Sequence, residues 1–118
     1  MNTIYYLASC DTCRKIIKTL PKNIDLDFQD IRENQINEVS LAKMYDLSGS
    51  YEALFSKRAQ LYKERGLKNQ ILTEKDYKAL ILEHYTFLSR PVFIIKNEIF
   101  IGNSQTTILK AMKALENV

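Results

Sequence analysis

The chain is organised around a short stretch near its N-terminus, TIYYLASCDTCR at residues 3–14. Residues 3–7 are mostly β-branched and aromatic, which predicts a buried strand. Beyond the cysteines, Ile16 and Leu20 recur at helical spacing, which predicts a helix. The chain therefore passes from strand to helix at the cysteines, and Cys10 is expected at or just before the helix N-terminus.

A cysteine pair with two intervening residues, Cys10 and Cys13, lies at this transition. Unpaired N–H groups and the helix dipole favour an anion there, and the thiolate is the nucleophilic form of cysteine. Such positions lower a cysteine pKa from about 8.5 to roughly 3.5–7.5. Because Cys13 follows within one helical turn, we expect it to reach Cys10 and resolve a mixed disulfide. The chain has no other cysteine, so the pair predicts a redox motif.

The composition is that of an ordinary globular domain, with 118 residues, 46% hydrophobic and 26% charged. No apolar run approaches the roughly 18–20 residues of a membrane span, and no secretory signal pattern is present, so we expect a cytoplasmic protein without a membrane partner. The net charge of +3 is too small to indicate direct nucleic-acid binding. A structural zinc site needs four ligands, and His84 is the only histidine, so neither a metal nor a bound cofactor is expected.

Strand patterns occur at both ends of the chain. Residues 26–29 alternate as a short strand, which completes a strand–helix–strand unit with parallel strands and a right-handed crossover. Strands at 91–95 and 99–101, joined by a turn at 96–98, predict a hairpin. A final helix is expected over 106–115. Its apolar face comprises Ile108, Leu109, Met112 and Leu115.

The segment between these halves is predicted to be helical. Asn37 or Ser40 is expected to cap a first helix, which ends at 48–50. A second helical piece stops at Gly66, and a third begins at Thr73, which forms a capping box with Asp76. The residues expected on the apolar faces are Leu41, Met44, Tyr45, Leu47, Tyr51, Leu54, Phe55, Leu61, Tyr62, Tyr77, Leu80, Ile81 and His84.

The order of elements predicts an α/β fold of the thioredoxin-like type. A βαβ unit and a ββα unit form a mixed four-stranded sheet, with a helical insertion between the two halves. We expect a single domain over 1–118, with the core at about 1–36 and 87–118 and the insertion at about 37–86.

Three segments resemble the ArsC (arsenate reductase) family, which includes the Spx transcription regulators. They are Cys10-X-Thr12-X-Arg14, the junction LSRP at 88–91, and ALFSKR at 53–58, which is followed by Tyr62 and Gly66-Leu67. The resemblance covers essentially the whole chain, and it implies a thioredoxin-like redox protein.

The resemblance implies a site for an oxyanion. The family's arsenate reductases attack arsenate with the early cysteine, matched here by Cys10, and surround the oxyanion with three arginines. Arg90 matches the arginine before the proline. In a gapless comparison the second arginine falls opposite Ser56, with Arg58 two residues on, and the third has no counterpart within 99–103. Glutathione and glutaredoxin complete the reduction in these enzymes.

Three further residues are predicted to shape the site. Pro91 opens a strand, and in thioredoxin-like folds a proline at this point is cis and faces the active cysteine. Thr12 is expected to cap the helix through its hydroxyl or to hydrogen-bond the Cys10 sulfur, and the two roles are compatible. Arg14 is either a surface residue of the first turn or a group that holds the thiolate or an incoming anion.

Two functions therefore remain open. One is a thiol-based oxidoreductase, with Cys10 as nucleophile and Cys13 as resolving cysteine, restored by glutathione with glutaredoxin or by thioredoxin. The other is an Spx-like regulator, because Cys13 and the Ser56-Lys57-Arg58 segment resemble the Spx branch. Spx proteins bind RNA polymerase at the C-terminal domain of its α-subunit, and they use the cysteine pair as a redox switch. A third alternative is a family member that only binds glutathione.

Overall fold

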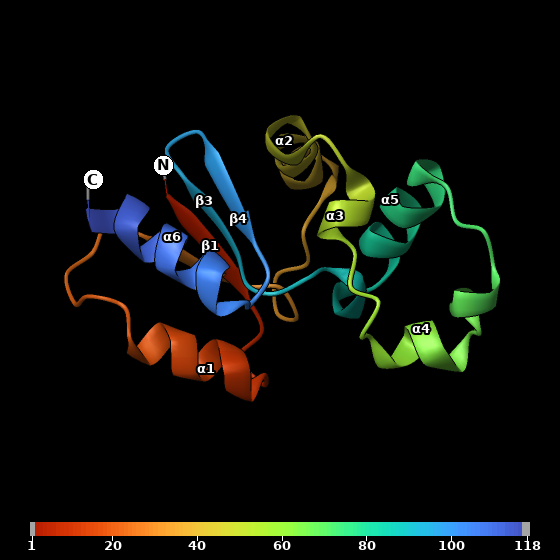
Figure 1. Cartoon of the computed structure of the whole chain (residues 1–118), viewed down its shortest axis with the longest axis horizontal. Coiled ribbons are helices and arrows are strands. Elements are labelled where there is room, and N and C mark those ends of the chain that lie inside the picture. Colours follow the sequence, from red (N-terminus) through yellow and green to blue (C-terminus); the bar gives the residue numbers. More distant parts are fainter. Residues whose placement is uncertain (1, 117–118) are drawn as a thin grey trace. The chain divides into compact units, whose positions relative to one another are not determined.

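The computed structural model describes residues 2–116, and within them the chain divides into two compact units (Figure 1). The first unit combines the segment up to Asn34 with the segment from Arg90 onward. The second unit is continuous and comprises Gln35–Ser89. No helix in the described range is long and apolar enough to span a bilayer.

The first unit contains a mixed four-stranded sheet of order β2-β1-β3-β4. Its strands are β1 (Thr3–Tyr6), β2 (Asp27–Asp30), β3 (Val92–Ile95) and β4 (Glu98–Ile101). β1 is parallel to β2 and antiparallel to β3, and β3 is antiparallel to β4. This arrangement confirms the predicted α/β fold with a parallel unit followed by a hairpin.

Two helices pack against the sheet of this unit: α1 (Asp11–Lys18) and α6 (Gln105–Glu116). Their apolar side chains bury Ile4 and Phe93, neither of which is exposed to solvent. Ile4 and Phe93 are paired across β1 and β3, so they lie on one face of the sheet. Leu109 is 62% exposed, contrary to the prediction, because the buried stripe of α6 runs through Ala111 and Leu115 instead.

The second unit is helical apart from one isolated β-bridge. Its helices are α2 (Glu38–Ser48), α3 (Tyr51–Leu54), α4 (Gln60–Glu64) and α5 (Glu74–Glu83), with short 3₁₀ turns η1 (Leu67–Asn69) and η2 (Tyr85–Phe87). The side-chain oxygen of Asn37 accepts the N–H of Ser40 at 2.9 Å, which confirms one of the two predicted caps. The capping box of Thr73 and Asp76 is also present in both directions.

Two expectations in this unit are wrong. The second helical piece is split into α3 and α4, because Phe55 leaves the helix and pairs with Leu88 in the β-bridge. The N–H of Ser56 donates to the carbonyl of Phe87 at 2.8 Å, which strengthens this pairing. His84 lies beyond the last turn of α5 in an extended conformation rather than on the helix face, and its Nδ1 accepts the N–H of Thr86 at 3.1 Å.

Candidate functional site

Cys10 is the N-cap residue of α1, at the point where the chain leaves β1. Its backbone is extended, its N–H donates to the carbonyl of Leu7 at 3.0 Å, and its carbonyl accepts the N–H of Arg14 at 3.0 Å. The Cys10 side chain is partly exposed, whereas the Cys13 side chain is only 1% exposed. Both thiols are free. A solvent-accessible sulfur thus lies at a helix N-terminus beside a buried one.

The two thiols have pKa values shifted in opposite directions. Partial burial raises the pKa of Cys10, but donation from the Cys13 backbone, the Cys13 thiol and the Thr12 backbone, together with the charge of Arg90, lowers it overall from 9.0. The backbone N–H groups of Thr12 and Cys13 face the Cys10 sulfur without forming an ordinary side-chain cap. Burial raises the pKa of Cys13 to about 11, and the nearby Cys10 thiolate adds to this rise. Cys10 is therefore the thiol that ionises first.

Arg90 and Pro91 join the site from the start of β3. The peptide bond between them is cis, as predicted, and Pro91 is buried. The carbonyl of Pro91 accepts the N–H of Gly102 at 2.9 Å, which ties this residue to the end of β4. The Arg90 guanidinium is close enough to lower the pKa of both thiols. The fold thus brings a cation from a distant segment to the cysteine pair.

Arg14 makes contacts other than the predicted contact with the thiolate or an anion, and Thr12 does not cap the helix with its hydroxyl. Arg14 forms a salt bridge with the carboxylate of Asp11 and donates to the carbonyl of Ala8 at 3.1 Å. Its guanidinium therefore ties together the turn that precedes the helix. Thr12 lies inside the first turn, because Cys10 holds the N-cap position, and it acts on the Cys10 sulfur through its backbone N–H. The expected hydroxyl cap is thus wrong.

Arg58 lies in the second unit, where it is exposed on the segment between α3 and α4, so the compact unit that holds the cysteines does not contain it. One residue of the site escaped the sequence analysis: Asp11, the partner of Arg14. The spacing of three residues on a helix, which places opposite charges side by side, was the signal for this pair. Among residues 2–116, no three His, Cys, Asp or Glu side chains gather as a metal site would need.

Comparison with known proteins assigns the chain to a family. The model of the ArsC family matches residues 5–111, which include both cysteines and the Arg90–Pro91 junction. The chain belongs to the ArsC family. This confirms the resemblance seen in the sequence, and the ArsC fold is thioredoxin-like, as predicted.

Relatives of two kinds are similar to this ArsC chain. A curated protein from Bacillus anthracis, named global transcriptional regulator Spx 2, is 28% identical over 113 residues, covering 93% of this chain and 86% of the relative. An arsenate reductase from Vibrio cholerae has a solved structure with a TM-score of 0.77 and 21% identity, covering 92% of this chain and 95% of its own. An arsenate reductase (ArsC) related protein from Brucella melitensis has a TM-score of 0.68 and 19% identity, with coverages of 95% and 94%. The structural likenesses establish the fold.

Proposed function

We propose that this ArsC protein performs thiol–disulfide redox chemistry, with Cys10 as the nucleophile and Cys13 as the resolving cysteine. The observation that supports this assignment is the opposite shift of the two thiol pKa values, lowered for the accessible Cys10 and raised to about 11 for the buried Cys13. A low-pKa, exposed thiol attacks first, and a neutral, protected thiol waits until a mixed disulfide forms.

The proposed reaction has two exchange steps. The Cys10 thiolate attacks one sulfur of a substrate disulfide, the substrate S–S bond breaks, and the leaving thiolate takes a proton from water. Cys13 then loses its proton and attacks the Cys10 sulfur, which releases the second substrate thiol and leaves a Cys10–Cys13 disulfide. The substrate gains two electrons. Glutathione with glutaredoxin, or thioredoxin, supplies two electrons to restore the pair.

An oxyanion substrate would use the same nucleophile. With arsenate, Cys10 would displace one oxygen as water to form a sulfur–arsenic bond. A second thiol would then attack the Cys10 sulfur, and the bonding pair would move to arsenic, giving arsenite and a disulfide. Arg90 and the N–H of Thr12 would hold negative charge, and Pro91 would shape the pocket wall. This chemistry suits a reducing compartment such as the cytoplasm, where the disulfide is reduced again.

The redox assignment is tested by titrating the pair against ratios of reduced and oxidised dithiothreitol, followed by trapping of free thiols and mass spectrometry. Wild type should lose two thiols together, whereas Cys10→Ser and Cys13→Ser should form no intramolecular disulfide. Arsenite formation from arsenate with glutathione and glutaredoxin should depend on Cys10. A pair that stays reduced throughout the titration, or turnover that survives Cys10→Ser, would refute the proposal.

A second candidate is a redox-controlled regulator that binds the C-terminal domain of the RNA polymerase α-subunit. The observation that favours it is the 28% identity, over 93% of the chain, to the protein named Spx 2. Binding of reduced and oxidised protein to the purified polymerase domain tests it directly. A stoichiometric complex that depends on the redox state, without turnover of any thiol substrate, would favour the regulator over the enzyme.

A further inference from the structure

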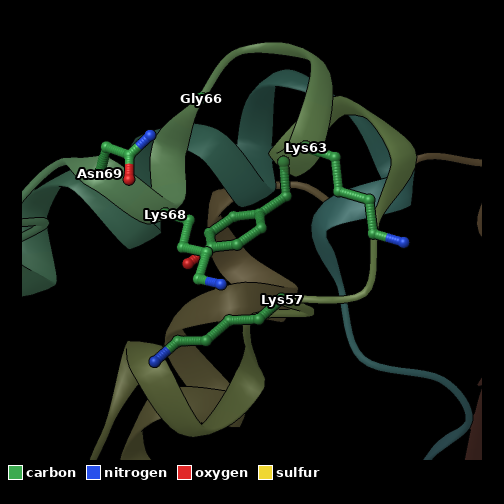
Figure 2. A pocket seen from close by; sticks show the side chains of 6 residues that line it. Lys57, Lys63, Gly66, Lys68 and Asn69 are labelled. Carbon is green, nitrogen blue, oxygen red and sulfur yellow. The ribbon is translucent and has the colours of Figure 1, made fainter.

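The second unit contains a pocket of about 540 Å³ that the redox chemistry does not use (Figure 2). Three of its lining residues are lysines, and the others supply an aromatic ring, an amide and a glycine backbone. They are Lys57, Tyr62, Lys63, Gly66, Lys68 and Asn69. A volume of this size falls in the range of small-molecule sites, about 300–1,000 Å³.

The chain path explains why these residues meet. Gly66 follows α4 with a φ of +64°, a conformation that glycine adopts without strain. Its N–H donates to the carbonyl of Lys63 at 3.1 Å, and its carbonyl accepts the N–H of Asn69 at 3.1 Å. The turn therefore brings Lys63, at the end of α4, and Lys68, in η1, to one pocket.

The pocket carries the positive charge of three lysines, one of which is paired with a carboxylate. Lys57 forms a salt bridge with Glu52 at 2.8 Å. Among the described residues, no carboxylate lies within ion-pair distance of Lys63 or Lys68. Figure 2 shows the side chains of Lys57 and Lys68 extending to the same side, whereas Lys63 runs the other way. An anion placed between Lys57 and Lys68 would meet the unpaired ammonium of Lys68 and the ammonium of Lys57, whose charge Glu52 already partly offsets.

Apolar surface is provided by Tyr62 and by the lysine stems. The Tyr62 ring packs edge-on against the buried Phe55, with centroids 5.8 Å apart and an interplanar angle of 64°. This contact fixes the ring while Tyr62 still lines the pocket and stays partly exposed. The methylene groups of lysine add apolar wall beside each charge. A ligand here would meet a planar surface next to cations.

We propose that this pocket binds a nucleotide, with its phosphates between Lys57 and Lys68 and its base against Tyr62. Lysine ammonium groups bind phosphate as point charges, and a phosphate monoester carries about −1.5 to −2 charges at pH 7. Base–aromatic stacking tolerates any base, because each base has a π-face. The concave shape and the modest net charge of +3 for the whole chain favour a small molecule over a nucleic-acid strand.

The experiment is isothermal titration of the full chain with ADP, at low and at physiological salt. Saturable binding is expected, and Lys68→Gln should weaken it by about tenfold or more, because one of the two phosphate contacts loses its charge. Lys43→Gln, an exposed lysine of α2 in the same unit, is the matched control and should stay within about twofold. Cys10→Ser should bind ADP like wild type, which separates this site from the redox proposal.

A second pair of measurements assigns the two parts of the ligand. Tyr62→Leu should weaken ADP binding but leave pyrophosphate binding unchanged, provided that urea unfolding shows the variant folded. If that variant does not fold, adenosine competition against ADP in wild type provides the same test. The proposal is overturned if ADP gives no saturable binding at millimolar concentration, or if Lys43→Gln and Lys68→Gln weaken it equally. Tighter binding of a single-stranded oligonucleotide that displaces ADP would also overturn it.

Discussion

The thiol of Cys13 acts as a hydrogen-bond donor to the sulfur of Cys10, and this contact shifts the two thiol pKa values apart. Burial is the largest influence on both groups and raises both pKa values. For Cys10 the surrounding donors and Arg90 outweigh burial, whereas for Cys13 burial prevails. One site therefore holds one reactive and one protected thiol.

The first prediction concerns the thiol of Cys13 as hydrogen-bond donor to the sulfur of Cys10. The rate of iodoacetamide alkylation of Cys10 should rise with pH through an inflection below 9.0. In Cys13→Ala the inflection should move upward, because the thiol donor is lost, and each unit of pKa increase reduces the thiolate fraction at neutral pH by about tenfold. Cys13→Ser retains a donor and should restore part of the shift. An inflection that is the same in wild type and Cys13→Ala would contradict this account.

The second prediction distinguishes the effects of Arg90 and Arg14 on the pKa of Cys10. Arg90→Gln should raise the pKa of Cys10 and slow its alkylation at neutral pH, whereas Arg90→Lys should preserve most of the effect because the charge remains. Arg14→Gln should change the alkylation profile less, because the Arg14 guanidinium is already engaged by Asp11 and by the Ala8 carbonyl. The exposed Arg32 provides a neutral control as Arg32→Gln. Equal effects of Arg14→Gln and Arg90→Gln would show that the electrostatic assignment is wrong.

The third prediction concerns Glu74, which joins α5 to α3. Its two carboxylate oxygens accept the N–H groups of Tyr51 at 2.7 Å and of Glu52 at 3.0 Å. These are unpaired donors of the first turn of α3, so Glu74→Ala should lower the free energy of unfolding by about 1 kcal/mol. Glu74→Gln keeps one acceptor oxygen and should lose less. Urea unfolding measures the change, with Glu64→Ala as an exposed carboxylate control that should stay within about 0.5 kcal/mol of wild type.

The fourth prediction concerns the pH dependence of the Arg65–Glu83 pair. The hydrogen bonds from Arg65 hold the pKa of Glu83 below its ordinary value of 4.5. A carboxylate with a lowered folded pKa stabilises the fold above its unfolded pKa, and this contribution is lost as pH falls through the folded pKa. The stability difference between wild type and Arg65→Gln should therefore be larger at pH 7 than at pH 3.

A smaller difference should persist at pH 3, because Arg65 also lies over the Phe87 ring, with its guanidinium carbon 5.5 Å from the ring centroid. Thermal unfolding of both proteins at the two pH values measures these differences. A stability difference between wild type and Arg65→Gln that is constant with pH would exclude the ion pair as its source. Glu83→Gln removes the carboxylate partner of the same contact. The thermal stability of this variant should therefore not show the pH dependence that the Glu83 carboxylate causes in this range.

Local features of the fold could be predicted from the sequence because they depend on neighbouring residues. The capping box of Thr73 and Asp76 and the cap at Asn37 join groups three residues apart, so the chain needs no tertiary contact to form them. The strand-to-helix transition at Cys10 follows from a change of apolar period within a few residues. The position of Cys10 at a helix N-terminus was therefore determined locally.

Features that depend on distant residues were decided by the tertiary structure. The helical prediction at Phe55 failed because this residue pairs with Leu88, and a backbone pairing across the chain overrides a local helical pattern. His84 leaves the helix through a local contact instead, since its ring accepts a hydrogen bond from the N–H of Thr86, two residues on. Neither partner is visible in apolar periodicity.

The sequence by itself determined the cysteine pair, its place at the start of α1 and the proline that opens the strand after Arg90. The tertiary structure decided which thiol is reactive. Cys13 becomes buried only when α1 packs in the first unit, and Arg90 reaches the thiols only when β3 pairs with β1. Burial and charge act through space over a few ångströms, so a pKa difference between two cysteines arises only once the folded chain has placed their neighbours.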